Sequence, residues 1–348
     1  MIGTQPGELM RSEIAEQPEC WAELATTQAD SIRVAARLLA APSTRLLVFA
    51  ARGSSDHAAQ YGQYLAHTTM RLPAMLATPA SITIDGAHLR YPGAVMIAVS
   101  QSGESPDLLA TVADAKLGGT PVIALTNNPS SQLAAMADVH VNLSAGPENS
   151  VAATKTYTAE LLALLLILTK ASAAPDIDLH ALCHDARALL AVADKNVGQW
   201  GRDLGAGQRL LLVGRGTSMS SAKEGALKLM ETCAVAASGW SAADATHGPL
   251  AQVVNGTPVI TFAAGSGRNS VTAFASLAAA NGAKVISVLE GIPDAVATWG
   301  AGVVSRPSPA LAPLLEILPM QRVALELALQ RGLNPDAPAG LRKVTLTH

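Results

Sequence analysis

Two short serine-rich loops carry the residues whose types and spacing are best suited to holding a ligand. Residues 52–55 are Arg-Gly-Ser-Ser, and residues 100–105 are Ser-Gln-Ser-Gly-Glu-Ser; each loop follows an apolar, strand-like segment. The second loop leads into a helical pattern. Hydroxyls and free backbone N–H groups at the start of a helix bind a phosphate with little need for positive charge. The loops therefore predict a phosphorylated small molecule as ligand.

Helix capping is the competing interpretation, because serines that follow strands commonly do nothing else. Two such loops in one half of the chain, with an internal copy in the other, favour the phosphate site. The predicted phosphate-binding residues are Ser54, Ser55, Ser100, Gln101, Ser102 and Ser105.

The chain repeats itself at an offset of 163 residues, which relates Gly53 to Gly216 and Ser55 to Ser218. Each copy alternates short apolar runs with helical patterns, which is typical of a parallel sheet covered on both faces. We therefore predict an α/β fold of two tandem doubly wound parallel sheets. Ligands bind at the carboxyl ends of strands in such sheets. The second copy of the serine loop, residues 263–268, has fewer hydroxyls, so one phosphate site is expected, in the first half.

Four parts are expected along the chain. An N-terminal helical arm spans residues 1–44, and the first domain, with the phosphate site, spans residues 45–195. The second domain spans residues 196–331. Residues 332–348 form a tail rich in proline and glycine, which predicts an extended segment that closes the active site.

Three further polar side chains are candidates for chemistry. Thr154 lies in a polar turn before an apolar helix and is suited either to a ligand contact or to capping. Glu231 is suited to general base catalysis, although Glu224 and Lys228 share its helical spacing and fit simple i,i+4 pairing. His247, in a Gly/Pro turn, is suited to proton transfer, although an ordinary surface histidine fits the same pattern.

Composition excludes several classes of function. The 348 residues are 49% apolar and carry a formal net charge of −3. The chain therefore lacks the excess of positive charge that is typical of proteins that bind nucleic acid or an anionic membrane. The most apolar stretch, residues 161–168, is too short to span a bilayer, and no signal peptide is expected. Three cysteines without a CxxC pair favour a reducing cytoplasm. The histidines lack metal-ligand spacing, so neither a metal nor a cofactor is expected.

Six motifs in order resemble the tandem sugar isomerase (SIS) family: RGSS, SQSGESPD, VAATKTYT, EGALKLMET, ATHGPLA and NPDxPxxLRKVT. The resemblance extends from about Gly7 to the C-terminus. It is strongest to the isomerase half of glucosamine-6-phosphate synthase and to stand-alone SIS-type glucosamine-6-phosphate deaminases.

The resemblance implies a role for each matched residue. Glu231 matches the glutamate that moves a proton between C1 and C2, and His247 matches the ring-opening histidine, which the neighbouring subunit supplies in the family. Lys343 matches a lysine that forms an imine with the open-chain sugar. A homodimer with a shared active site is therefore expected. The implied substrate-binding residues are Gly53, Ser54, Ser55, Ser100, Gln101, Ser102, Ser105, Val151, Ala152 and Thr154.

Departures from the synthase pattern favour deamination over synthesis. Residue 2 is Ile, so neither a glutaminase domain nor glutamine hydrolysis is expected; Arg52 replaces a cysteine and Thr246 a lysine. The resemblance thus implies conversion of glucosamine 6-phosphate to fructose 6-phosphate and ammonia. A fructosamine-6-phosphate deglycase and a galactosamine-6-phosphate deaminase/isomerase remain alternatives. A non-catalytic phosphosugar regulator is disfavoured by the two repeats, the absence of a basic domain and the retained Glu231.

Overall fold

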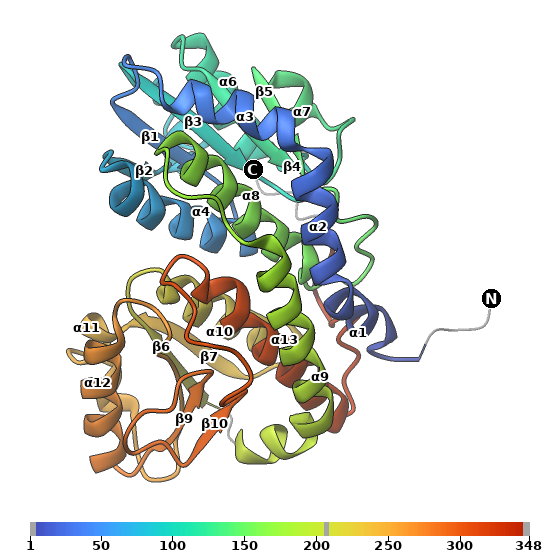
Figure 1. Cartoon of the computed structure of the whole chain (residues 1–348), viewed down its shortest axis with the longest axis vertical. Coiled ribbons are helices and arrows are strands. Elements are labelled where there is room, and N and C mark those ends of the chain that lie inside the picture. Colours follow the sequence, from blue (N-terminus) through green and yellow to red (C-terminus); the bar gives the residue numbers. More distant parts are fainter. Residues whose placement is uncertain (1–4, 205–208, 344–348) are drawn as a thin grey trace. The chain divides into compact units, whose positions relative to one another are not determined.

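The computed structural model describes residues 5–204 and 209–343, and the chain forms two compact units (Figure 1). The N-sheet unit comprises Glu19–Glu148, Lys155–Leu179 and the end of the chain from Arg342. The C-sheet unit comprises Asn149–Thr154, His180–Leu341 and the N-terminal segment up to Pro18. Residues 1–4 of the expected arm, 205–208 of the expected second domain and 344–348 of the expected tail lie outside the described residues.

The N-sheet unit is built on five parallel strands in the order β2-β1-β3-β4-β5. The strands are β1 (Leu46–Ala50), β2 (Ala74–Leu76), β3 (Ala94–Val99), β4 (Val122–Thr126) and β5 (Val139–Asn142). The helices are α2 (Gln17–Thr27), α3 (Ala29–Leu39), α4 (Ser54–Leu65), η1 (Ala66–Met70), α5 (Pro79–Thr83), α6 (Pro106–Leu117), α7 (Gln132–Met136) and α8 (Lys155–Ala171).

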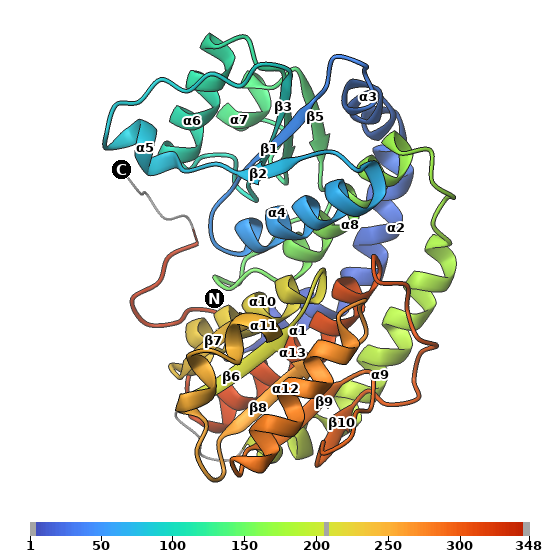
Figure 2. The ribbon, with the colours of Figure 1, turned by 90° about the vertical axis from the view of Figure 1, so that its left-hand side faces the viewer.

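Both faces of the N sheet are covered, which explains why its strands are apolar without alternation. Val48 and Met96 share one face with Leu108 of α6 and Leu133 of α7. The helices α4 and α8 cover the opposite face (Figure 2). Strand order reverses between β1 and β3, so the chain leaves these two neighbouring strands toward opposite faces. That arrangement opens a crevice at the carboxyl edge of the sheet.

The C-sheet unit repeats this topology with the order β10-β9-β8-β6-β7, again all parallel. Its strands are β6 (Arg209–Gly214), β7 (Ala236–Ser241), β8 (Pro258–Phe262), β9 (Lys284–Val288) and β10 (Ala297–Trp299). Its helices are α1 (Glu8–Ala15), α9 (Leu179–Leu204), α10 (Ser218–Cys233), α11 (Ala242–Ala245), η2 (Pro249–Gln252), α12 (Arg268–Ala280) and α13 (Ala312–Gln330). The predicted fold class of two tandem doubly wound parallel sheets is confirmed.

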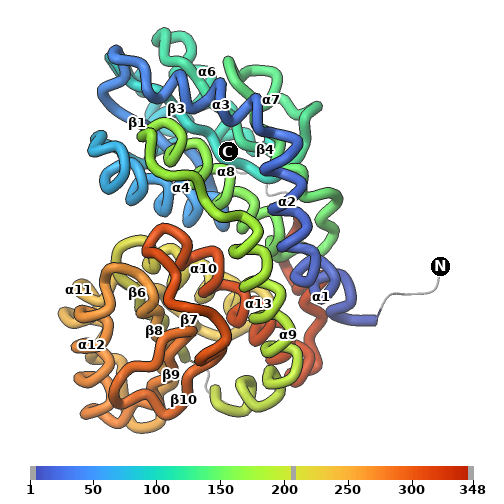
Figure 3. The backbone as a smooth tube through the Cα atoms, viewed as in Figure 1, coloured from blue at the N-terminus to red at the C-terminus, as the bar shows by residue number. Residues whose placement is uncertain are grey.

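Helices α10 and α13 pack closely together in the C-sheet unit (Figure 3). Gly225 permits the close approach of α10 to the sheet, since a Cβ there would lie 2.9 Å from Leu212 of β6. On the other face, Leu211 and Val259 pack with Phe274 of α12.

The units do not follow the four parts expected from the sequence. Helix α9 runs across residue 195, where the first domain was expected to end, and the whole helix from His180 groups with the C sheet. The helical N-terminal segment is divided at Pro18 between the two units. Hydrophobic periodicity predicts a helix but not which sheet it covers. Residues 332–343 of the expected tail form turns and include no helix or strand.

No helix among the described residues is long and apolar enough to cross a membrane.

A serine–glutamate contact recurs at the same place in both units. Ser55 of α4 donates to Glu160 of α8 at 2.7 Å. In the C-sheet unit, Ser218 of α10 donates to Oε1 of Glu316 of α13 at 2.9 Å, and Ser221 donates to Oε2 at 2.7 Å. Glu316 is fully buried, and burial raises its pKa to about 7, although the serines and the Ala264 amide oppose that shift.

The raised pKa of Glu316 predicts a pH-dependent stability. The folded chain keeps a proton on Glu316 up to about pH 7, whereas a glutamate in the unfolded chain loses it near pH ~4.3. Since the folded state binds more protons in that window, this group makes the free energy of unfolding fall as pH rises from about 5 to 7. The contribution is at most about 3 kcal/mol, at roughly 1.4 kcal/mol per pKa unit.

Glu316→Gln should flatten this pH dependence, measured by urea unfolding with tryptophan fluorescence from pH 5 to 8. Glu326→Gln is the matched control, because Glu326 lies on the same helix and is only half-buried. If the free energy of unfolding changes with pH equally in the two variants, Glu316 is not the source of the pH dependence.

Candidate functional site

The two serine-rich loops meet at the carboxyl edge of the N sheet, as expected for loops that follow adjacent parallel strands. Arg52, from the loop after β1, donates through Nε to Oδ2 of Asp107 at the start of α6, with the two atoms 2.6 Å apart. The Asp107 side chain is only 5% exposed, whereas that of Arg52 is 43% exposed. This ion pair crosses the switch point and ties the two predicted loops together.

The loop after β3 is shaped by its own hydrogen bonds. The Gly103 amide donates to Oγ of Ser100 at 3.1 Å, and the Glu104 amide donates to Oγ of Ser102 at 3.3 Å. Gly103 has φ 68°, and an added Cβ would lie 2.3 Å from Oγ of Ser131, which caps α7. A glycine is therefore needed both for the backbone conformation and for the close approach to the α7 cap.

The predicted phosphate-binding side chains differ in how accessible they are. Gln101, Ser102 and Ser105 are half-buried. Ser105 is the N-cap residue of α6. Among the described residues of that helix, its hydroxyl accepts from no backbone amide. Ser55 and Ser100 are buried, and the Ser55 proton is directed to Glu160. At the start of α6, Pro106 has no N–H, and the Leu108 and Leu109 amides are bonded to Asp107 Oδ1 and to the Ser105 carbonyl, so the Asp107 amide is the main-chain donor that faces this edge. The loop after β3 thus offers side-chain donors, whereas Ser55 contributes chiefly its position at the start of α4.

The loop of residues 149–154, expected to contact the sugar, is held from two sides within the C-sheet unit. Glu13 of α1 is buried and accepts from the amides of Asn149 and Ser150. The Val151 amide donates to the carbonyl of Asp336 at 3.0 Å. Both supporting residues are far away in sequence, and neither was predicted.

These contacts limit how the loop can serve a ligand. The Val151 amide is already used, so a ligand would meet the carbonyl of that residue and not its N–H. Ala152 and Thr154 are fully buried, and the Thr154 carbonyl accepts from Gln321 at 3.3 Å. The structure therefore argues against ligand contacts from the Val151 amide and from the buried Thr154 side chain.

Glu231 lies in a cluster with two other charged residues on α10. Lys228 is fully buried, and its ammonium lies 2.5 Å from Oε2 of Glu231 and 3.3 Å from Oε1 of Glu224. Burial alone lowers the pKa of Lys228, but the two carboxylates outweigh it and hold that pKa above its ordinary value. The lysine therefore stays charged and fixes the Glu231 carboxylate, whose side chain is 23% exposed.

Sequence reasoning treated Lys228 only as a helix-pairing partner of Glu224. The spacing of three residues to Glu231 was a visible signal. Full burial of the ammonium depends on the tertiary packing of α10, which no local pattern reports.

His247 and Lys343 have contrasting surroundings. His247 is exposed in the turn after α11, and its ring forms no hydrogen bond or ion pair with another described residue. Lys343 lies at the end of the described chain, where its ammonium is 2.7 Å from the fully buried carboxylate of Glu148. Glu148 also accepts from the Thr156 amide and hydroxyl at the start of α8. Lys343 is thus held by a buried carboxylate that is itself anchored at the start of α8.

The equivalent edge of the C sheet is closely packed. A Cβ on Gly267 would lie 2.2 Å from Cβ of Arg215, and one on Gly265 would lie 2.6 Å from Oγ of Ser218. The loops after β6 and β8 therefore press against each other. This packing, with the scarcity of hydroxyls there, supports a single phosphate site in the N-sheet unit.

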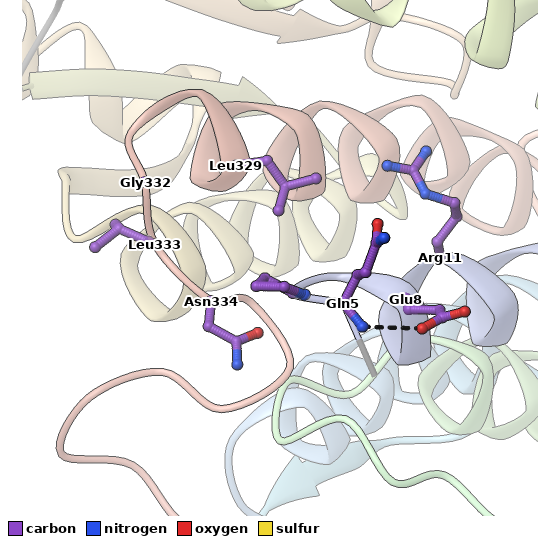
Figure 4. A pocket seen from close by; sticks show the side chains of 8 residues that line it. Gln5, Glu8, Arg11, Leu329, Gly332, Leu333 and Asn334 are labelled. Atoms are coloured by element: carbon purple, nitrogen blue, oxygen red, sulfur yellow. Dashed lines mark hydrogen bonds between the residues drawn. The ribbon is translucent and has the colours of Figure 1, made fainter. Parts of the chain in front are cut away.

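A pocket of about 620 Å³ opens elsewhere in the C-sheet unit, beside the end of α13 (Figure 4). Arg11 and Glu8 of α1 line it together with Leu329 and Asn334. It contains none of the predicted site residues. No group of three His, Cys, Asp or Glu residues within the described ranges is arranged to hold a metal ion.

A family model described as the SIS domain matches residues 43–170 and 205–296. The isomerizing glutamine–fructose-6-phosphate aminotransferase of Thermococcus kodakarensis is 31% identical over 347 residues, which cover 96% of this chain and 57% of that protein. The chain therefore spans little more than half the length of the curated relatives it matches.

Two solved structures have the same fold. A proposed phosphosugar isomerase of Silicibacter pomeroyi is 34% identical with a TM-score of 0.83, over 94% of this chain and 99% of that one. Glucosamine-6-phosphate deaminase of Thermotoga maritima has a TM-score of 0.80 at 19% identity, over 98% of this chain and 100% of that one. The second likeness concerns the fold alone.

Gly103→Ala should destabilise the loop after β3 and weaken phosphosugar binding. Alanine at positive φ costs about 1–2 kcal/mol, and the clash with Ser131 adds overpacking strain of a further ~1–3 kcal/mol. Gly119→Ala is the matched control, since Gly119 has φ 81° with nothing within 4 Å of an added Cβ. Thermal unfolding and calorimetric titration with glucitol 6-phosphate measure both effects. Equal behaviour of the two variants would show that the Ser131 contact is unimportant.

Proposed function

The chain belongs to the SIS domain family, and on that premise we propose that it is an aldose–ketose isomerase and deaminase of amino-sugar phosphates. The proposed reaction converts glucosamine 6-phosphate and water to fructose 6-phosphate and ammonia. The observation that carries the proposal is the serine loop after β3, whose half-buried hydroxyls adjoin a helix start at the switch point. A relative named for fructose 6-phosphate supports the same class of substrate.

The phosphate supplies binding energy at a distance from the reacting carbons. Gln101, Ser102 and Ser105 donate to it, together with the Ser55 amide at the start of α4 and the Asp107 amide at the start of α6. A phosphate held in this way orients the open-chain sugar, so that binding energy is used for positioning.

Glu231 is the proposed proton carrier. It removes the proton from C2 of the open-chain aldose and returns a proton to C1, which turns the C2 amine into an imine. Lys228 keeps the carboxylate oriented through the 2.5 Å contact. His247 assists ring opening from a neighbouring subunit, so the active form is a homodimer.

Release of ammonia completes the reaction. Water adds to the imine carbon at C2, the C2–N bond breaks, and a ketone with free ammonia remains, so that atoms balance. Lys343 is proposed to act on the sugar carbonyl. Because its ammonium is paired with Glu148, it must leave that carboxylate and lose a proton before an imine can form.

Arg52 and Thr246, which stand where the synthase pattern has cysteine and lysine, favour deamination over synthesis. The test incubates the chain with glucosamine 6-phosphate and quantifies ammonia and fructose 6-phosphate in one reaction. Equal amounts of both are expected. Turnover only with galactosamine 6-phosphate or a fructosamine 6-phosphate would reassign the substrate, and no turnover with any of them would contradict the proposal.

Glu231→Gln should lower kcat at least about 100-fold, which is the usual contribution of a general base. Its affinity for glucitol 6-phosphate should stay within about threefold, because the phosphate contacts are untouched. Glu290→Gln is the control: Glu290 has similar exposure and pairs with Arg268 at 2.6 Å in the same unit. A Glu231→Gln variant that keeps full turnover would remove Glu231 from the mechanism. If the wild type binds the phosphate without turnover, a phosphosugar sensor becomes the better assignment.

A further inference from the structure

We propose that Arg52 is a phosphate-binding residue of this chain, and that Asp107 positions its guanidinium for that contact. The inference rests on the proposed function, since it assigns one more ligand to the same phosphosugar site. It concerns a residue that stands where the related synthases have cysteine, so the likeness to them does not supply it.

Arg52 lies where a phosphate would be bound. It follows β1 and is joined to the first turn of α6 by the 2.6 Å contact with Asp107, across the point where strand order reverses. It is the only basic residue in residues 52–55 and 100–105. The remaining donors of these loops are neutral hydroxyls, an amide side chain and backbone N–H groups.

The contact with Asp107 leaves most of the guanidinium available. Arg52 uses Nε, and among the described residues no acceptor is hydrogen-bonded to its two Nη nitrogens. The side chain is 43% exposed, so a ligand can reach it. A guanidinium carries five N–H groups in one plane, and its Nη groups match two phosphate oxygens.

Asp107 is held in place independently of Arg52. Its Oδ1 accepts from the Leu108 amide at 2.8 Å, and its side chain is almost fully buried. A fixed carboxylate restricts the rotamers of the arginine before the ligand arrives, which lowers the entropy cost of binding. The other acidic residue of the loop, Glu104, is engaged by the Gln132 amide at 3.1 Å.

An alternative role for the ion pair is purely structural, as a tie between two loops. The two roles make different predictions for ligand affinity. If the ion pair only ties the loops together, removing either partner should weaken binding equally. If Arg52 contacts the phosphate, removing the arginine should weaken binding more, since Arg52 keeps its charge and its Nη groups when Asp107 is neutralised.

The test is calorimetric titration of the full chain with glucitol 6-phosphate, with unphosphorylated glucitol as the ligand control. Arg52→Gln should weaken binding of the phosphate about 10- to 100-fold, in line with loss of a charge-assisted bidentate contact. Arg52→Lys keeps the positive charge but loses the paired Nη groups, so its affinity for glucitol 6-phosphate should lie between those of Arg52→Gln and the wild type. Asp107→Asn should weaken binding less than about fivefold. Thermal unfolding of each variant verifies that it is folded.

Wild-type affinity in Arg52→Gln would overturn the inference, and so would an equal loss in Asp107→Asn and Arg52→Gln. If Arg52→Gln does not fold, Arg52→Lys decides, because wild-type affinity there excludes a bidentate contact. Wild-type binding without turnover would contradict only the proposed reaction. A wild type that does not bind glucitol 6-phosphate would contradict both the phosphate site and this inference.

Discussion

The reversal of strand order between β1 and β3 is the constraint on which the rest of the site depends. Since both strands are parallel and adjacent, their following loops must emerge at the same edge. The helices that continue from them, α4 and α6, cover opposite faces and leave that edge open. Two helix starts, the Ser100–Ser105 loop and the Arg52–Asp107 ion pair meet there as a consequence of topology.

The C sheet has the same topology but a different use of this edge. Both units keep a serine at the start of the helix after the first strand, bonded to a buried glutamate of a later helix: Ser55 with Glu160, and Ser218 with Glu316. At the edge itself, Gly267 packs against Arg215, and the loop after β8 has one serine where the loop after β3 has three. The helix α10 of this unit instead carries the charged cluster of Glu231 and Lys228. Duplication preserved the scaffold contact while the loops diverged.

Sequence alone predicted the elements and the loops because their signals are local. Unbroken apolar strands, the repeat and the serines after β1 and β3 are all visible within short windows. Long-range packing determined what was missed: the full burial of Lys228, the support of the 149–154 loop by Glu13 and Asp336, and the grouping of α9 with the C sheet. The arginine at position 52 was noticed only as a departure, because its partner Asp107 is 55 residues away.

The crystal structure of the chain with glucitol 6-phosphate tests the central claim most directly, because it locates the phosphate. The account predicts phosphate oxygens at the carboxyl edge of the N sheet, within hydrogen-bonding distance of Ser102, Ser105 and the Asp107 amide of α6. A phosphate bound at the edge of the C sheet, or in the pocket beside Arg11, would contradict it.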